Sequence, residues 1–389
     1  MQLHHALSRT LPFLTLLATL SVGAAPAVRG VTIDMVTVGD PGNAGQTLTY
    51  ANGGSLTFGR VDYTYKIAKH EVTIGQYAEF LNAVAKSDPN GLWTSQLGWD
   101  STIAGIARGG ADGSYVYTVT GPSGLKPAGA SSPTDRPITY VSWFDAARFA
   151  NWMANGQPTG AQGPGTTENG AYDLVGISTT FAPARNSVNP NTNAAPTFFL
   201  PTEDEWYKAA FYKGGGVNAG YWGFATQSDA TPGNTIGGDA NQANYFGVYQ
   251  PGSVGYAVTH SSSYSSSQNY LTEVGAFTSS ASSYGTFDQS GNVWEWNDYT
   301  GSAVTTSRGL RDGYWDTGSD ADALSSGVRA SAAPTTKSWQ YGFRLADGSA
   351  ASPAPGGVPE IDPAGFGSVL ALVTGVLGLV ERRRGTTGV

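Results

Sequence analysis

The chain has 389 residues, a formal net charge of −8, only 13% charged residues and no cysteine. Without cysteine it has no disulfide, zinc–thiolate site or thiol nucleophile, and its acidic balance, with no basic stripe in the body of the chain, argues against a nucleic-acid partner. The 53 glycines, ten tryptophans and twenty tyrosines predict a loop-rich globular fold with an aromatic core.

Residues 1–27 have the three parts of a secretory signal peptide. A short basic start containing Arg9 precedes an apolar run at 11–22, and Ala25 and Ala27 fit a small-x-small cleavage site. The alternative is an N-terminal helix buried in the fold. The signal peptide predicts an exported protein.

Residues 31–347 are predicted to form one domain with three helices. Apolar residues recur at helical spacing in three segments: 72–84, 142–153 and 201–211. Thr73 and Thr202 are residue types that cap the start of a helix. The acidic residues 203–205 are interpreted as the start of a helix, where they suit the helix dipole, rather than as catalytic carboxylates.

Short alternating runs predict strands at 61–67 and 115–119. Residues 252–284 are rich in Ser, Tyr and Gly and nearly without charge, so they are predicted to be mostly loop. A Ser-, Ala- and Pro-rich stretch at 348–357 is predicted to be a linker.

The tail at 358–384 resembles the PEP-CTERM sorting signal, which exosortase reads in bacteria. A Val-Pro-Glu motif at 358–360 precedes an uncharged apolar segment at 364–380 and three arginines at 382–384. The segment is long enough for a short membrane helix, with the arginines on the cytoplasmic side. This copy reads Val-Pro-Glu rather than Pro-Glu-Pro, and the alternative is a simple C-terminal anchor. Both interpretations place the body outside the cytoplasmic membrane.

Six short motifs follow one another along the body of the chain. They are His-Glu-Val-Thr at 70–73, Pro-Ile-Thr-Tyr-Val-Ser-Trp at 137–143, Leu-Pro-Thr-Glu-Asp-Glu-Trp at 200–206, Gly-Asn-Val-Trp-Glu-Trp at 291–296, Leu-Arg-Asp-Gly-Tyr-Trp at 310–315 and Gly-Phe-Arg at 342–344. Together they resemble the formylglycine-generating-enzyme (sulfatase-modifying-factor) family. The resemblance implies a loop-rich α+β variant of the C-type-lectin fold, with few short helices and short antiparallel strands.

Catalytic members of that family oxidise a sulfatase cysteine to formylglycine with copper(I) held by two cysteines. The corresponding positions here fall near Thr317 and Asp322, and oxygen ligands do not replace thiolates on copper(I). A related branch uses iron held by three histidines, but only His70 and His260 lie outside the signal peptide. We therefore expect no copper and no catalytic residues. The alternative is a formylglycine-generating-type oxidoreductase that works by a cysteine-free route.

The resemblance also implies a calcium site in the turn that leads into the Trp-Glu-Trp element. The matching positions are Asp288 and Glu295 for side-chain oxygens, and Gly291 and Val293 for backbone carbonyls. Hard oxygen donors in a tight, glycine-containing loop suit calcium. The alternative is that Asp288 only caps a turn and Glu295 pairs with an arginine such as Arg344.

An acidic, aromatic segment near the family's active-site region is the candidate ligand face. Its residues are Tyr314, Trp315, Asp316, Asp320 and Asp322. Trp339 and Tyr341 are expected nearby. Exposed aromatic rings beside carboxylates suit carbohydrate or peptide contacts. The alternatives are that the rings belong to the core and that the acidic loop is simply solvated.

These expectations define a non-catalytic, ligand-binding or structural protein on the surface or in the extracellular matrix of a bacterium. Signal peptidase and exosortase would process it, and its C-terminal helix would anchor it transiently or permanently. Its extracellular ligand would be a glycan or a peptide.

Overall fold

The computed structural model describes most of the domain and neither end of the chain. The described residues are 30–50, 53–103, 105–120, 133–177, 181–250, 252–299, 306–317 and 321–348. The predicted signal peptide, sorting signal and membrane segment 364–380 lie outside them. Among the described residues, no helix has the length and apolar character needed to cross a membrane. Every helix and strand below belongs to the unit Val31–Val389.

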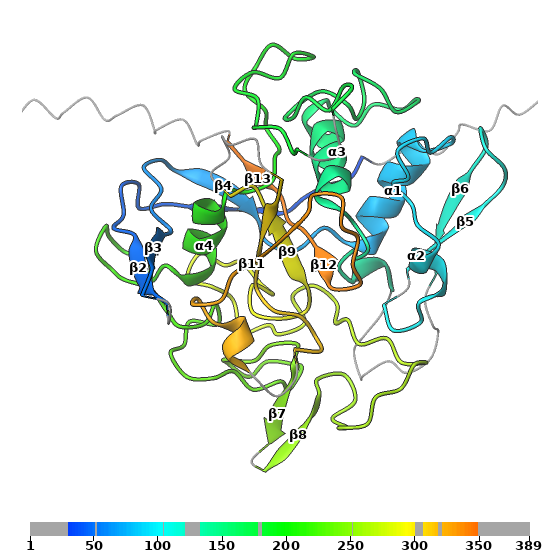
Figure 1. Cartoon of the computed structure of the whole chain (residues 1–389). Coiled ribbons are helices and arrows are strands. Elements are labelled where there is room, and N and C mark those ends of the chain that lie inside the picture. The colour runs from blue at the N-terminus through cyan, green and yellow to red at the C-terminus, as the bar shows by residue number, and fades with distance from the viewer. Residues whose placement is uncertain are drawn as a thin grey trace, which may run out of the picture. The chain divides into compact units, whose positions relative to one another are not determined.

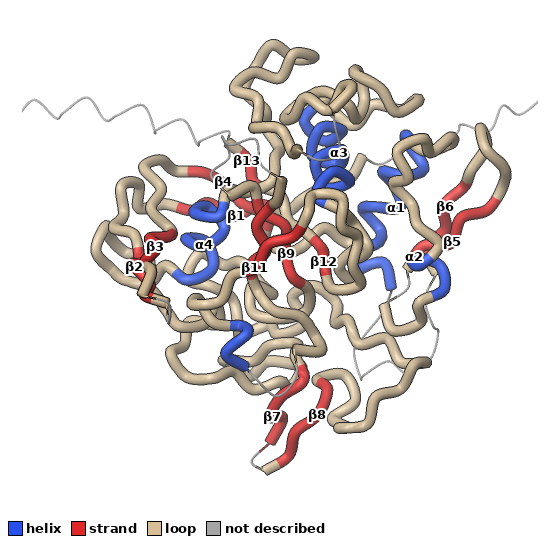
Figure 2. The backbone as a smooth tube through the Cα atoms, in the orientation of Figure 1, coloured by secondary structure: helices blue, strands red, loops and turns tan. Residues whose placement is uncertain are grey.

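The described elements are short and are joined by long loops, as the tan tube in Figure 2 shows. The helices are α1 (Ile74–Val84), α2 (Gln96–Trp99), α3 (Trp143–Ala154) and α4 (Glu203–Phe211), with 3-10 turns at Pro133–Asp135 and Ala321–Leu324. The strands are β1 (Met35–Val38), β2 (Gln46–Thr49), β3 (Ser55–Phe58), β4 (Tyr65–Ala68), β5 (Ile106–Gly109), β6 (Val116–Val119), β7 (Phe246–Gln250), β8 (Ser253–Tyr256), β9 (Trp294–Asn297), β10 (Arg308–Arg311), β11 (Ala330–Ala332), β12 (Tyr341–Gly342) and β13 (Ala346–Asp347). This arrangement confirms the predicted loop-rich α+β class.

Two small sheets organise the fold. One has the order β1-β4-β13 and is antiparallel; the other has the order β11-β10-β9-β12, in which only β9 and β12 run parallel. In the view of Figure 1, β9, β11 and β12 lie between α4 on one side and α1 and α3 on the other. Three two-stranded hairpins, β2–β3, β5–β6 and β7–β8, complete the strands. The Trp-Glu-Trp element therefore forms β9, a strand of the central sheet.

The three predicted helices are confirmed, because the signals that define them are local. Each of α1, α3 and α4 begins with a capping box, in which the side chain of Thr73, Ser142 or Thr202 accepts from the third helical backbone N–H. The third helical side chain returns the contact to the cap residue's N–H in all three. These boxes satisfy backbone donors that would otherwise be left without partners at a buried helix end.

The strand predictions are only partly correct. The segment predicted at 61–67 forms a strand only from Tyr65 onward, where it pairs with β1, and the segment at 115–119 is β6, paired with β5. The prediction of mostly loop at 252–284 is confirmed; the strand in this segment is β8, which pairs with β7. Gly252, with φ of 80°, lies at the reversal between the two strands, where a residue without Cβ avoids strain.

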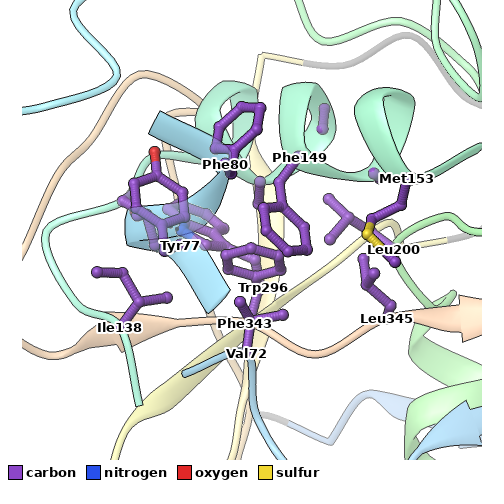
Figure 3. Close-up of a cluster of buried hydrophobic side chains, with 14 of the residues drawn as sticks. Val72, Tyr77, Phe80, Ile138, Phe149, Met153, Leu200, Trp296, Phe343 and Leu345 are labelled. Carbon is purple, nitrogen blue, oxygen red and sulfur yellow. Dashed lines mark hydrogen bonds between the residues drawn. The ribbon is translucent and has the colours of Figure 1, made fainter. Parts of the chain in front are cut away.

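Aromatic rings from distant segments fill the main core (Figure 3). Phe149 of α3 packs edge-on against Phe80 of α1 at 5.3 Å between ring centroids and against Phe343 at 5.5 Å. Trp296 of β9 is also fully buried in this core, and its indole N–H donates to the carbonyl of Val141. Edge-to-face contacts of this kind add to the area the rings bury. The core therefore joins α1 and α3 to the last part of the domain.

Candidate ligand-binding site

A buried ion pair joins Glu295 of β9 to Arg344, which lies between β12 and β13. The Nε and Nη2 atoms of Arg344 donate to the two carboxylate oxygens of Glu295 at 2.6 Å each. Both side chains have no exposed surface. The indole N–H of Trp206, in α4, donates to the same carboxylate at 2.8 Å. The pair therefore connects the central sheet with α4.

The remaining N–H groups of Arg344 donate to backbone carbonyls of other segments. Nη1 donates to Ala68 at 3.1 Å and to Lys69 at 3.3 Å, and Nη2 donates to Phe287 at 2.8 Å. All five guanidinium donors thus have partners, which is the condition for burying an arginine without a large penalty. Burial alone would lower the pKa of Arg344, but the carboxylate of Glu295 outweighs it and the pKa is raised.

Two more carboxylates lie near this pair. Asn292 donates to Glu71 at 3.1 Å, and Glu71 Oε2 is 4.0 Å from Arg344 Nη2. Burial raises the pKa of Glu71 well above its usual range, and the charge of Asp288 raises it further. Burial also raises the pKa of Asp288 to about 6, although the backbone N–H of Gly275 donates to it at 2.5 Å. Three carboxyl groups, those of Glu295, Glu71 and Asp288, therefore lie around the single guanidinium group of Arg344.

Asp312 adds a further carboxylate to this region. It has a φ of 83°, in the left-handed region that favours glycine, and one of its oxygens accepts from the backbone N–H groups of Gly291 and Gly313. Its other oxygen is buried and has no hydrogen-bond partner within the described structure. Burial is the main reason that the pKa of Asp312 is raised well above its usual range, followed by the charge of Glu295.

The predicted calcium ligands lie together in the turn 288–295, but Glu295 is already paired. The alternative of a Glu295–Arg344 pair is confirmed. One buried oxygen of Glu71 has no hydrogen-bond partner among the described residues, and this oxygen and the neighbouring acids fit a hard cation chemically. In the described part of the chain, no three His, Cys, Asp or Glu side chains form a group that could hold a metal. Backbone carbonyls, as predicted for Gly291 and Val293, would have to supply the rest, and the calcium site stays a prediction.

The acidic first turn of α4 is occupied by ion pairs and caps. Glu203 accepts from Arg329 at 2.9 and 2.6 Å and from Arg311 at 2.8 Å, while Glu205 accepts from the backbone N–H of Thr202 at 2.7 Å. These contacts agree with its interpretation as a helix start.

An open groove of about 850 Å³ lies on a different part of the domain. It is lined by Trp99, Asp100, Ser101, Thr102, Tyr256, Tyr264, Ser266, Trp315, Asp316 and Trp339. These residues come from the end of α2, from β8 and the loop after it, from the segment after β10, and from the segment before β12. The groove is therefore assembled from four separate parts of the chain.

Aromatic rings form a stacked column at the groove. Tyr264 stacks on Tyr270 with centroids 5.6 Å apart, and Tyr270 stacks on Trp315 at 4.7 Å with the planes 8° apart. Trp315 is only 2% exposed, whereas Tyr264 is 55% exposed and Trp99 is 67% exposed. Trp99 and Tyr264 are thus large exposed rings that line the same groove, whereas Trp315 belongs to the core.

Two carboxylates of the groove are held in place by hydroxyl groups. Asp100 accepts from the hydroxyl of Tyr140 at 2.8 Å and from that of Thr102 at 2.6 Å. Asp316 accepts from the hydroxyl of Tyr256 at 3.1 Å, and burial raises its pKa. None of the described residues that line the groove is Lys, Arg or His. The groove therefore combines aromatic surface with fixed hydrogen-bond acceptors.

The predicted ligand face is divided by the structure. Trp315 and Asp316 line the groove, and Tyr314 packs beside it with its ring 5.2 Å from that of Trp339. Asp322 is exposed on the 3-10 turn Ala321–Leu324 and does not line the groove, while Asp320 lies outside the described residues.

The other candidate residues, Trp339, Tyr341 and the two histidines, do not all line the groove either. Trp339 lines the groove as expected, but Tyr341 instead packs on Trp296 at 5.2 Å. Burial, followed by the charge of Arg344, lowers the pKa of His70 to about 4, and His260 lies in a turn with φ of 50°. Neither histidine lines the groove.

Sequence reasoning missed two of the four segments of the groove. Trp99 ends a helix of only four residues and Asp100 follows it, and Tyr256 and Tyr264 lie in the segment predicted to be mostly loop. The one available signal was the concentration of Trp, Tyr and Asp in segments that lack helical or strand periodicity.

Fold and site together define an α+β domain that has a loop-built groove and a buried network of ion pairs. The chain belongs to the FGE-sulfatase family: residues 34–348 match the Sulfatase-modifying factor enzyme 1-like domain. No curated protein sequence matches the chain.

Three solved structures are similar over most of their length. Treponema denticola variable protein 1 has 20% identity and a TM-score of 0.43, covering 82% of this chain and 96% of its own. CarF has 23% identity and a TM-score of 0.37, with coverages of 81% and 98%. PvdO from Pseudomonas aeruginosa has 18% identity and a TM-score of 0.40, with coverages of 80% and 93%. Similarity this remote says nothing about the ligand.

Breaking the Glu295–Arg344 pair should destabilise the domain strongly. Arg344→Met leaves a buried carboxylate without its counter-charge, and the expected loss in the free energy of unfolding is about 3–5 kcal/mol, measured by urea denaturation. The matched control is Arg60→Met, which removes an exposed pair with Asp62 and should change stability little. Equal effects of the two substitutions would contradict the structural role of Arg344.

Proposed function

We propose that this chain is an exported, surface-associated, non-catalytic member of its family that binds carbohydrate in the aromatic groove. The observation that carries the proposal is the pair of strongly exposed rings, Trp99 and Tyr264, in a groove that also contains Asp100 and Asp316.

Sugar rings have the chemistry that this groove complements. The apolar C–H face of a pyranose packs on an aromatic ring, and its hydroxyls need acceptors such as the carboxylates of Asp100 and Asp316. The indole N–H of Trp315, which lines the groove, is buried and lacks an acceptor among the described residues. The groove thus offers aromatic rings for the apolar face of a sugar and carboxylates for its hydroxyl groups.

A peptide fits the groove less well than a sugar does. Peptides commonly bind by adding a strand to an open sheet edge. Tyr256 is the one strand residue in the lining, and its backbone N–H already donates to the carbonyl of Ser261 at 3.0 Å. The groove therefore recognises its ligand through side chains.

The non-catalytic part of the proposal rests on the absence of cysteine. The positions that correspond to the family's copper ligands fall near Thr317 and Asp322, and neither offers the soft thiolate that copper(I) prefers. Thr317 directly follows Asp316 of the groove. A region that serves oxidation in catalytic relatives is thus proposed to serve binding here.

Binding should depend on the exposed rings. On a glycan array, the purified chain is expected to bind at least one neutral or amine-bearing glycan, and Trp99→Ala should weaken that binding at least tenfold because the stacking surface is lost. Phe181→Ala, which removes another exposed ring outside the groove lining, is the matched control.

Two outcomes would refute the proposed function. One is the absence of binding to any glycan. The other is conversion of the cysteine in a sulfatase-derived peptide to the aldehyde by the purified chain with copper and oxygen, which would support the oxidoreductase alternative.

Calcium is proposed to bind in the turn 288–295, where Asp288, Gly291, Val293 and Glu295 would hold it. A cation there would offset the charge of the surrounding acids. A ligand that binds only the folded state stabilises it by about 2.7 kcal/mol at a hundredfold excess over its Kd, so calcium should raise the melting temperature relative to a chelator.

The calcium-dependent rise should vanish in Asp288→Asn, which keeps the shape of the side chain and removes its charge. It should persist in Asp229→Asn, a change on an exposed carboxylate. Identical melting of the unmodified chain with calcium and with chelator would remove the site.

A further inference from the structure

We infer that the groove selects carbohydrates bearing a protonated amine, so that its ligand is an amino-sugar polymer rather than a neutral or acidic glycan. The inference rests on the proposed carbohydrate binding and names the class of sugar. It follows from the charges of the groove, from how they are held and from the rings beside them.

The charges in the groove have one sign. Among the described residues that line the groove, Asp100 and Asp316 carry charge and none is basic. Lys337 precedes Trp339 closely in the sequence, but its ammonium donates to Gly91 and pairs with Asp145 at 2.8 Å. The ammonium group of Lys337 therefore does not neutralise the carboxylates of the groove. An anionic glycan would meet uncompensated repulsion, which selects against it.

The two carboxylates are held before any ligand arrives. Three hydroxyl groups, from Thr102, Tyr140 and Tyr256, donate to them at 2.6–3.1 Å. Acceptors fixed in this way lose little conformational entropy when an ammonium group binds. The attraction between these carboxylates and an ammonium group can therefore distinguish a sugar with a charged amine from one with a neutral amide at the same ring position.

The aromatic rings reinforce the same preference. An ammonium group near the face of a tryptophan or tyrosine is attracted by the ring quadrupole, and tryptophan gives the strongest contact. Trp99 directly precedes Asp100 and is 67% exposed, so its ring is open to a ligand ammonium beside that carboxylate. The surface contributions of a cation–π contact and an ion pair together correspond to a preference of about tenfold.

The test compares two oligosaccharides that differ only in the amine. The full chain is titrated calorimetrically, at mildly acidic pH, with a β-1,4-linked glucosamine tetramer and with its fully N-acetylated counterpart. The glucosamine tetramer should bind about tenfold more tightly. Asp100→Asn and Asp316→Asn should each reduce this ratio, whereas Asp112→Asn, on an exposed residue outside the groove lining, should leave it unchanged.

The outcomes separate this inference from the proposed function. Equal affinity for the two tetramers overturns the amine preference and leaves carbohydrate binding intact. Binding of neither tetramer overturns the amino-sugar assignment, and the glycan array then decides on carbohydrate binding itself. Tighter binding of a lysine tetrapeptide than of the glucosamine tetramer also overturns the inference, since the occupant would then be a cationic peptide. Trp99→Ala should weaken both sugars, which shows that they bind in the groove.

Discussion

The buried pair between Glu295 and Arg344 is the interaction on which the rest of the structure depends. One guanidinium group connects β9 to the carbonyls of Ala68, Lys69 and Phe287, and the same carboxylate accepts from Trp206 of α4. Segments far apart in the sequence are thereby fixed to one another at atomic distances. Short helices and strands joined by long loops contain few regular backbone hydrogen bonds. Buried ion pairs whose donors and acceptors are all satisfied therefore contribute much of what specifies this fold. Such pairs are costly to break from one side only.

The same framework explains how a loop-rich domain can present a defined groove. A second buried set, Arg311 and Arg329 with Glu203, joins β10 to the start of α4. Trp315 and Asp316 follow β10 by a few residues, and Trp339 directly precedes the segment that leads to β12. Two of the four segments of the groove therefore leave directly from the ion-paired sheet. The segment around Tyr264 reaches it through ring stacking, in the column from Tyr264 through Tyr270 to Trp315. The segment around Trp99 is held by the hydrogen bond from the hydroxyl of Tyr140 to Asp100.

Local features of the fold could be predicted from sequence, and contacts between distant segments could not. The helices at 74–84, 143–154 and 203–211 combine periodic apolar residues with caps a few residues away, so their signals lie within one stretch. Order and spacing of the motifs indicated the family. The groove escaped prediction because Trp99 and Tyr264 are brought together only by tertiary structure, in segments without periodicity. Pairing of Glu295 with Arg344 was one of two alternatives, because spacing alone does not show which partner a buried carboxylate takes.

The most direct measurement is a crystal structure of the chain with the glucosamine tetramer bound. Sugar rings stacked on Trp99 and Tyr264, with an ammonium group within hydrogen-bond distance of Asp100 or Asp316, are the predicted result. The Glu295–Arg344 pair should be unchanged. A tetramer bound elsewhere on the domain, with the aromatic groove still empty, would contradict the assignment of the groove as the binding site.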